Sequence, residues 1–201
     1  MICHKYKTIF VHIPKTGGTS VECMFGLVKY NKKYKSMREM FQYQEGKHWT
    51  AQEKREHYPE FFKEYYKWTI IRNPWEKEWS LYNMCKNRKK FMGRTFKEFL
   101  KGFVDAANSG IRTTMTLNQI DFIEINKKNA MNEIVRFEDL GKEWRSICEK
   151  IKKPYEPMIH LRNTKKNHIE EDYDQECIDI VAEFRKRDIE YFNYKLPKEL
   201  H

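Results

Sequence analysis

Three short runs of β-branched and aromatic residues alternate along the chain with longer segments in which apolar residues recur every three or four positions. The runs are TIFVHI at 8–13, KWTIIR at 67–72 and EIVRF at 133–137. Runs of this kind predict buried strands, and the longer spacing predicts amphipathic helices. Strands that alternate with helices are typical of a parallel sheet. The sequence therefore predicts an α/β fold in which helices flank both faces of a parallel sheet.

Capping residues mark where several of the helices begin. Thr50 is followed three residues later by Glu53, the spacing of a capping box, and Thr95 precedes a second apolar segment. Pro74, close behind the second strand, suits the first turn of a helix. We expect helices over about 19–28, from 50, from 74, from 95, over 138–151 and over 173–191, with loops at 30–38, 102–118 and 152–167. No repeat or low-complexity linker interrupts this pattern, so residues 1–201 are expected to form a single domain.

The composition limits the choice of partner and compartment. Lys and Arg number 39 against 29 Asp and Glu, which gives a net charge of +10 over 201 residues. This excess favours an anionic partner such as a nucleotide, an acidic glycan or nucleic acid, although a solubilising Lys-rich surface also explains it. The five cysteines are scattered and form no CxxC pair, so neither a disulfide framework nor a metal site is expected. No segment approaches the ~20 apolar residues of a membrane span and no signal peptide is evident, which predicts a cytoplasmic protein without membrane contact.

The end of the first strand carries the most informative segment, PKTGGTS at 14–20. Gly17 and Gly18 have no Cβ, so the backbone there can approach a ligand closely. Thr19 or Ser20 is expected to cap the helix that follows, whose first N–H groups point back at the turn. A strand, a glycine turn and a helix N-terminus together form an anion pocket, to which Lys15 and Thr16 add a charge and a hydroxyl. The segment therefore predicts a P-loop-like phosphate site.

A kinase or NTPase is the first function that such a loop suggests. The usual pattern is GxxxxGK[ST], in which the lysine follows the last glycine. In this chain Lys15 precedes both glycines, and no apolar strand ends in an Asp that would hold magnesium. Phosphoryl transfer is therefore disfavoured. Arg72 ends the second strand, and ligands of open α/β sheets bind at the carboxyl ends of strands, so Arg72 is expected in the same crevice as the loop.

Two motifs together resemble a known family. HIPKTGGTS at 12–20, followed by IRNPWEKEWSLY at 71–82, is similar to the sulfotransferases that use 3′-phosphoadenosine 5′-phosphosulfate (PAPS). The resemblance is nearest to the branch of heparan-type 2-O- and 6-O-sulfotransferases and their small bacterial and viral relatives. It extends to VRFEDL at 135–140 and DIEYFNY at 188–194, and thus covers most of the chain.

The resemblance implies a set of donor contacts. The first motif would wrap the 5′-phosphosulfate through Pro14, Lys15, Thr16, Gly17, Gly18, Thr19 and Ser20. Arg72 and Ser80, at the family's RxPxxxxxS spacing, would bind the 3′-phosphate. Thr164 and Lys165 lie in NTKK at 163–166, which is similar to a late segment that closes over the nucleotide. Lys15 would also stabilise the charge on the departing phosphate oxygen, and no metal would be needed.

A catalytic base is suggested by HWT at 48–50, which is similar to an element of the glycan branch in which a His precedes a short helix. The ordinary pKa of ~6.5 lets a histidine accept a hydroxyl proton near neutral pH. His48 is therefore the candidate base, and His12 and His57 are its competitors. A lone histidine before a helix is more often structural, so the resemblance carries this assignment.

These observations lead to one main hypothesis and two alternatives. The chain is expected to be a PAPS-dependent sulfotransferase that acts on a hydroxyl, with a carbohydrate as the expected acceptor and no specific nucleic-acid partner. The first alternative is a P-loop kinase or NTPase. The second is a basic protein that keeps a nucleotide-binding fold without transfer activity.

Overall fold

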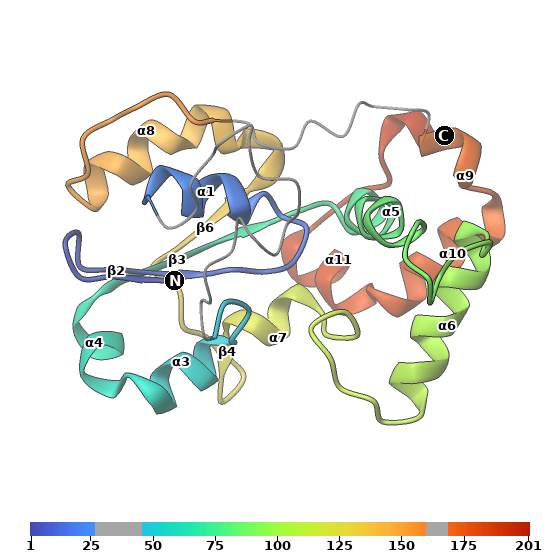
Figure 1. Ribbon diagram of the computed structural model, residues 1–201, viewed down its shortest axis with the longest axis horizontal. Helices are drawn as coiled ribbons and strands as arrows, with labels where there is room; N and C mark the ends of the chain where they lie inside the picture. Colours follow the sequence, from blue (N-terminus) through green and yellow to red (C-terminus); the bar gives the residue numbers. More distant parts are fainter. Residues whose placement is uncertain (27–45, 160–168) are drawn as a thin grey trace. The chain divides into compact units, whose positions relative to one another are not determined.

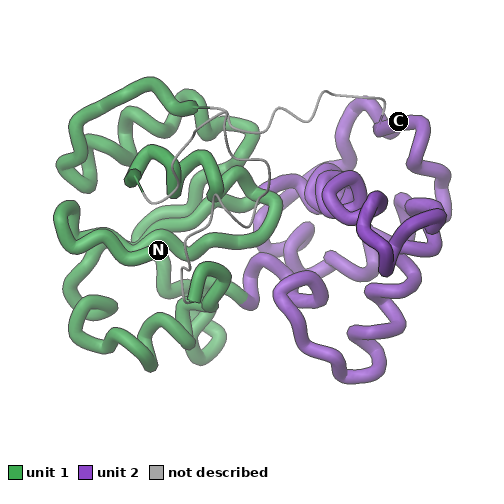
Figure 2. The backbone as a smooth tube through the Cα atoms, viewed as in Figure 1, with its two compact units in different colours: residues 1–71, 122–163 green, residues 72–121, 164–201 purple. Residues whose placement is uncertain are grey.

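The structure is a computed structural model that describes residues 1–26, 46–159 and 169–201 (Figure 1). The chain divides into two compact units (Figure 2). Unit 1 comprises residues 1–71 and 122–163, and unit 2 comprises residues 72–121 and 164–201. The expectation of a single domain over residues 1–201 stays a prediction.

Unit 1 contains a four-stranded sheet in the order β1-β2-β3-β6. The strands are β1 (Ile2–Cys3), β2 (Thr8–Val11), β3 (Tyr66–Ile71) and β6 (Glu133–Arg136). β2 pairs with β3, and β3 with β6, in parallel, whereas β1 pairs with β2 in antiparallel orientation. The three predicted strands are thus confirmed, and the sequence pattern did not indicate β1, which is only two residues long.

Helices cover the sheet of unit 1 (Figure 1). They are α1 (Gly18–Met24), α3 (Ala51–His57), α4 (Pro59–Glu64) and α8 (Leu140–Lys150), the last preceded by a 3-10 turn at Phe137–Asp139. A small hairpin, β4 (Glu124–Ile125) and β5 (Lys128–Asn129), follows α7 (Gln119–Ile123). α1 and α8 lie across the sheet from α3 and α4 (Figure 1), and all four residues of β2 are buried. This is the mixed α/β architecture of a parallel-containing sheet flanked by helices.

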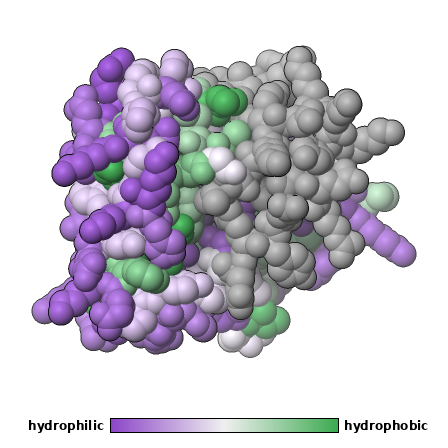
Figure 3. Space-filling view, turned by 60° about the vertical axis from the view of Figure 1, so that its left-hand side comes forward, coloured by the Kyte–Doolittle hydropathy of each residue, from purple (hydrophilic) through white to green (hydrophobic). Residues whose placement is uncertain are grey.

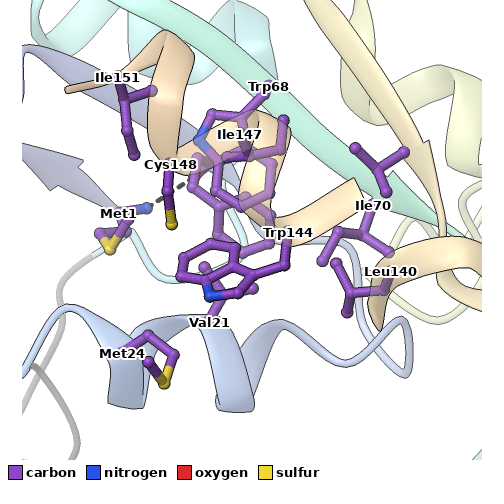
Figure 4. Close-up of a cluster of buried hydrophobic side chains, with 12 residues drawn as sticks. Met1, Val21, Met24, Trp68, Ile70, Leu140, Trp144, Ile147, Cys148 and Ile151 are labelled. Atoms are coloured by element: carbon purple, nitrogen blue, oxygen red, sulfur yellow. Dashed lines mark hydrogen bonds between the residues drawn. The ribbon is translucent and has the colours of Figure 1, made fainter. Parts of the chain in front are cut away.

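The core of unit 1 joins α1 and α8 to one face of the sheet (Figure 4). Trp68 of β3 and Trp144 of α8 are its largest side chains, with ring centroids 6.3 Å apart and almost no exposed surface. Val21 and Met24 reach this core from α1, at the i, i+3 spacing that predicted the helix. α1 is thereby held against the sheet directly after the loop at 14–17.

Unit 2 is helical. Its helices are α5 (Pro74–Cys85), α6 (Phe96–Asn108), α9 (Ile169–Asp172), α10 (Gln175–Phe184) and α11 (Lys186–Phe192), with a 3-10 turn at Lys198–Leu200. Asn73 caps α5, with Pro74 in its first turn, and Thr95 with Glu98 forms a complete capping box on α6. The predicted starts of both helices are confirmed, as is the capping box of Thr50 and Glu53 on α3.

Two predicted boundaries in unit 2 are wrong. α6 continues to Asn108, inside the segment expected to be a loop, because its apolar spacing runs on through Phe103 and one glycine weakens a helix by only about 1 kcal/mol. The single helix expected over 173–191 is two helices that meet at Arg185. The Arg185 side chain is fully buried and donates to the carbonyls of residues 115–117. These carbonyls lie in the segment between α6 and α7, about 70 positions earlier in the chain, so the sequence pattern around Arg185 does not reveal the contacts.

The surface agrees with the polar composition. One side of the described molecule shows mostly hydrophilic side chains with smaller apolar patches between them (Figure 3). Within residues 1–26, 46–159 and 169–201, no helix is both long and apolar enough to cross a bilayer.

Candidate functional site

The segment after β2 turns the chain sharply into α1. Lys15 and Gly17 both have left-handed backbones, with φ values of 70° and 86°. The hydroxyl of Thr16 donates to the carbonyl of Ile13 at 2.9 Å, a buried hydrogen bond that links the two ends of the turn. The N-cap of α1 is Gly17, so the expectation that Thr19 or Ser20 caps this helix is wrong. The left-handed backbone at Gly17 starts the helix earlier, and Gly17 offers no side chain to its first N–H groups.

The two glycines of the turn are packed against other parts of unit 1. A Cβ on Gly17 would lie 2.9 Å from the ring of Phe137, and a Cβ on Gly18 would lie 2.3 Å from Cδ2 of His12. Neither position has room for a larger side chain. The packing therefore supplies a structural reason for both glycines, in addition to the close approach of a ligand that the sequence suggested.

Directly before the turn, His12 is held by a buried carboxylate. Nδ1 of His12 and Oε1 of Glu22 on α1 are 2.7 Å apart, and Oε2 of Glu22 accepts from Nζ of Lys47 at 2.7 Å. Burial raises the pKa of Glu22, but the hydrogen bonds from His12 and Lys47 outweigh it and bring that pKa to about 2. Burial lowers the pKa of His12 to about 3, although Glu22 opposes the shift. At neutral pH Glu22 is therefore an anion and His12 a neutral ring that donates from Nδ1.

His48 lies against His12. Its Nδ1 is 2.9 Å from the carbonyl oxygen of His12, and the two rings have centroids 4.5 Å apart in an edge-to-face arrangement. A carbonyl oxygen only accepts, so Nδ1 of His48 carries the proton and Nε2 of the neutral ring keeps its lone pair. Burial lowers the pKa of His48, and the hydrogen bond to His12 only partly offsets the shift. The structure thus brings a neutral histidine with a defined tautomer beside the strand end that precedes the loop.

The two competing histidines differ from His48 in their surroundings. His12 is only 3% exposed, and its Nδ1 is occupied by Glu22. His57 lies on the exposed side of α3 and stacks on Trp49, with ring centroids 4.0 Å apart. Of the three, His48 combines partial exposure with a fixed tautomer, which is what a general base requires.

In unit 2, Arg72 is clamped by Gln119. The backbone N–H of Arg72 donates to Oε1 of Gln119, and Nε2 of Gln119 donates to the Arg72 carbonyl, both at 2.9 Å. Gln119 is in turn fixed by Asp188, whose carboxylate accepts from the backbone N–H groups of Gln119 and Ile120 at 2.8 and 3.0 Å. The guanidinium of Arg72 pairs with Glu76 at 3.1 Å, one helical turn along α5. The backbone of Arg72 is thus held on both its donor and its acceptor.

A comparison with family models matches the Sulfotransferase family over residues 1–195. The chain belongs to the sulfotransferase family. No curated protein and no solved structure matches it. Membership of this family indicates a transferase that moves a sulfuryl group, and it agrees with the resemblance carried by the motifs at 12–20 and 71–82.

The sulfotransferase motif residues occupy defined places in the two units. In unit 1, Thr16 and Gly18 are buried, while Pro14, Lys15, Gly17, Thr19 and Ser20 are half-buried. In unit 2, Ser80 is buried in α5, and Arg72 directly follows β3 in the chain. The expectation that Arg72 shares a crevice with the loop stays a prediction. Thr164 and Lys165 lie outside the described residues.

Sequence reasoning missed several polar residues of this sulfotransferase. Glu22 and Gln119 are fully buried, and Glu76 pairs with Arg72. Glu22 directly follows Val21 on α1, and a charged residue there reads as solvent-facing until its partners are known. Of these contacts, the sequence could have indicated only the one between Arg72 and Glu76, which have the i, i+4 spacing of a helical ion pair. Within the described ranges, no group of three or more His, Cys, Asp or Glu side chains is arranged to hold a metal ion.

Proposed function

We propose that this sulfotransferase transfers a sulfuryl group from PAPS to a hydroxyl of a carbohydrate. The observation that carries the proposal is the neutral His48, whose Nδ1 is fixed by the carbonyl of His12 just before the loop at 14–20. The family supports sulfuryl transfer in general. PAPS as donor and a carbohydrate as acceptor rest on the motif resemblance to the heparan-type branch, and an acidic glycan also suits a net charge of +10.

The donor contacts follow the motifs. Residues 14–20 form a P-loop-like cradle for the 5′-phosphosulfate, with a lysine, three hydroxyl side chains and the N-terminus of α1. Arg72 and Ser80 bind the 3′-phosphate, and Thr164 and Lys165 close over the nucleotide. The guanidinium has five N–H donors, so Arg72 can keep its pair with Glu76 while it donates to a phosphate.

The proposed reaction is an in-line displacement at sulfur. The acceptor oxygen forms a bond to sulfur, Nε2 of His48 takes the hydroxyl proton, and the bond between sulfur and the 5′-phosphate oxygen breaks. Lys15 and the loop N–H groups stabilise the negative charge that develops on that oxygen, and one such donor is worth about 3–4 kcal/mol. The lowered pKa of His48 keeps the ring neutral before the reaction and lets the imidazolium lose its proton afterwards. This mechanism uses no metal.

The test is a transfer assay with PAPS that carries radiolabelled sulfate, offered with heparan-type glycans, phenols and peptides. Label should appear on the glycans, and His48→Ala should reduce its rate about 10²–10⁴-fold. Lys15→Ala should reduce the rate about 10²–10³-fold. Label on phenols alone would show that the acceptor is a phenol and not a carbohydrate. A folded protein that transfers no label to any acceptor would refute the proposed function.

A further inference from the structure

Glu22 is a buried carboxylate that the proposed reaction does not use. It lies in α1, 0% exposed, in the helix that begins at the proposed anion site. A buried charge costs several kcal/mol unless it is paired, and this one would also repel a bound phosphosulfate. Both of its oxygens are occupied, one by Nδ1 of His12 and the other by Nζ of Lys47, each at 2.7 Å. The partners therefore explain how the charge is tolerated, and they indicate what it does.

Both partners of Glu22 lead to His48. Lys47 directly precedes His48 in the chain. The ion pair between Lys47 and Glu22 therefore ties the backbone next to His48 to α1. His12 supplies the carbonyl that accepts from Nδ1 of His48, and its ring contacts the His48 ring edge to face. The His12 ring is itself confined between Glu22 and Gly18, where a single added Cβ would clash at 2.3 Å. Glu22 thus contacts both the segment that precedes His48 and the His12 ring that packs against the His48 ring.

We infer that Glu22 is a positioning residue for His48, acting through Lys47 and His12. This inference rests on the proposed function, in which His48 is the base. Glu22 holds His12 and Lys47 in place. The His12 carbonyl then fixes the His48 tautomer, Nε2 faces the acceptor hydroxyl, and the charge of Glu22 balances the Lys47 cation.

The charges around His48 give the inference a signed consequence. Among the described residues, the groups that act on the pKa of His48 include the His12 carbonyl, the Lys47 cation, the Glu22 anion and the terminal amino group of Met1. Lys47 lowers the pKa of His48, and Glu22 raises it. Removing the charge of Glu22 should therefore move the pKa of His48 down, and removing that of Lys47 should move it up. The opposite shifts test whether the two charges act on His48, and the tautomer and kcat test whether Glu22 positions it.

The experiment compares Glu22→Gln, Lys47→Met and the wild type, with Glu64→Gln as a control that changes the same charge at an exposed position of α4. Imidazole ¹⁵N NMR of each protein reports the tautomer and the pKa of His48, and steady-state kinetics report kcat and the KM for PAPS. Glu22→Gln should lower kcat about 10- to 100-fold at unchanged KM, because a base misplaced by about 1 Å has an effect of that size. The acid limb of its pH profile should move down, and that of Lys47→Met up.

The outcomes separate the inference from the proposed function. If the wild type transfers no sulfuryl group, the proposed function fails, while the NMR readout still tests whether Glu22 orders His48. A Glu22→Gln protein with the wild-type tautomer, pKa and kcat overturns the inference. A rise in the KM for PAPS with an unchanged His48 signal also overturns it, because Glu22 would then act on the donor loop. If Glu22→Gln does not fold, Lys47→Met decides, because it breaks the same ion pair. An unchanged His48 tautomer and kcat in Lys47→Met would then overturn the inference.

Discussion

At the scale of single residues, two histidines that are close in space have different chemical characters. His12 is enclosed and paired with Glu22, which makes it a fixed neutral donor. His48 is half-buried and donates to a backbone carbonyl, which leaves Nε2 as the basic atom. The sequence named both as candidates and preferred His48 through its resemblance to the glycan branch. The contacts supply the physical reason for that preference.

A substitution that keeps only the structural half of His48 tests this division. Asn has a side-chain N–H that can replace Nδ1 as a donor to the His12 carbonyl, but it has no basic nitrogen. His48→Asn should therefore retain the melting temperature and the affinity for adenosine 3′,5′-bisphosphate while transfer falls about 10²–10⁴-fold. Calorimetry measures the melting temperature and the affinity, and the transfer assay measures the rate. A loss of affinity in His48→Asn, as large as the loss of rate, would mean that His48 has a structural role.

The dependence of the free energy of unfolding on acid pH reports on the buried pair of His12 and Glu22. The pKa of His12 is about 3 in the folded protein and ~6.5 in an unfolded chain, so between these two pH values mainly the unfolded state binds the proton. The pKa of Glu22 is also lowered by folding, to about 2, so it acts in the same direction below its ordinary pKa of 4.5. Both stabilising contributions are present at neutral pH, and the free energy of unfolding should decrease as the pH falls, by at most about 1.4 kcal/mol per pH unit for one group.

Urea unfolding between pH 7 and pH 4 measures this slope, and His12→Gln is the informative variant. Gln can donate to Glu22 but does not titrate, so the slope between pH 6.5 and pH 4.5 should become shallower. Equal slopes in the two proteins would show that His12 is protonated in the folded state at these pH values.

At the scale of elements, the predictable features were the local ones. The capping boxes at Thr50 and Thr95 and the proline start of α5 depend on residues within one helical turn, so the sequence contains them completely. The break at Arg185 depends on carbonyls about 70 positions away in the chain, and the clamp of Gln119 on Arg72 spans 47. From the sequence alone, buried polar residues of this kind are predicted to be exposed, because residues with a charge or an amide are mostly exposed and their distant partners are not known.

Two glycines, one in α1 and one in α8, should respond in opposite ways to alanine. Gly18→Ala would place a Cβ 2.3 Å from the His12 ring, which Glu22 and the core hold in position. We expect a loss of about 1–3 kcal/mol from overpacking. Gly141 in α8 has nothing within 4 Å of an added Cβ, so Gly141→Ala should add up to about 0.5–1 kcal/mol. Thermal unfolding of both variants measures this, and a Gly18→Ala protein as stable as the wild type would contradict the tight contact.

At the scale of the whole molecule, the order of the strands was the part of the fold that the sequence left open. Alternating strands and helices predicted a parallel sheet, and the order β1-β2-β3-β6 places β2 and β3 as parallel neighbours. The two motifs of the family therefore follow adjacent strands, the loop at 14–20 after β2 and Arg72 after β3. Family membership and the order of the two motifs along the chain thus agree with the order of the strands in the sheet.

Binding of the nucleotide product measures the donor site without an acceptor. A ligand that binds only the folded state at a hundred times its Kd adds about 2.7 kcal/mol to stability, which corresponds to about 5–10 °C in a chain of this length. Adenosine 3′,5′-bisphosphate should produce such a shift without magnesium, and ATP with magnesium should produce a smaller one. Arg72→Ala should remove most of the shift, because the guanidinium is proposed to bind the 3′-phosphate.

The matched control for Arg72→Ala is Arg88→Ala, which removes the same charge at an exposed position after α5. If the net charge of +10 alone attracts the bisphosphate, the two variants should lose equally, and both losses should disappear as salt screens them. If Arg72 binds the 3′-phosphate, only Arg72→Ala should lose the shift, and salt should weaken it much less. A larger response to ATP with magnesium would instead favour a kinase or NTPase. The comparison therefore distinguishes a specific donor site from general attraction to a basic surface.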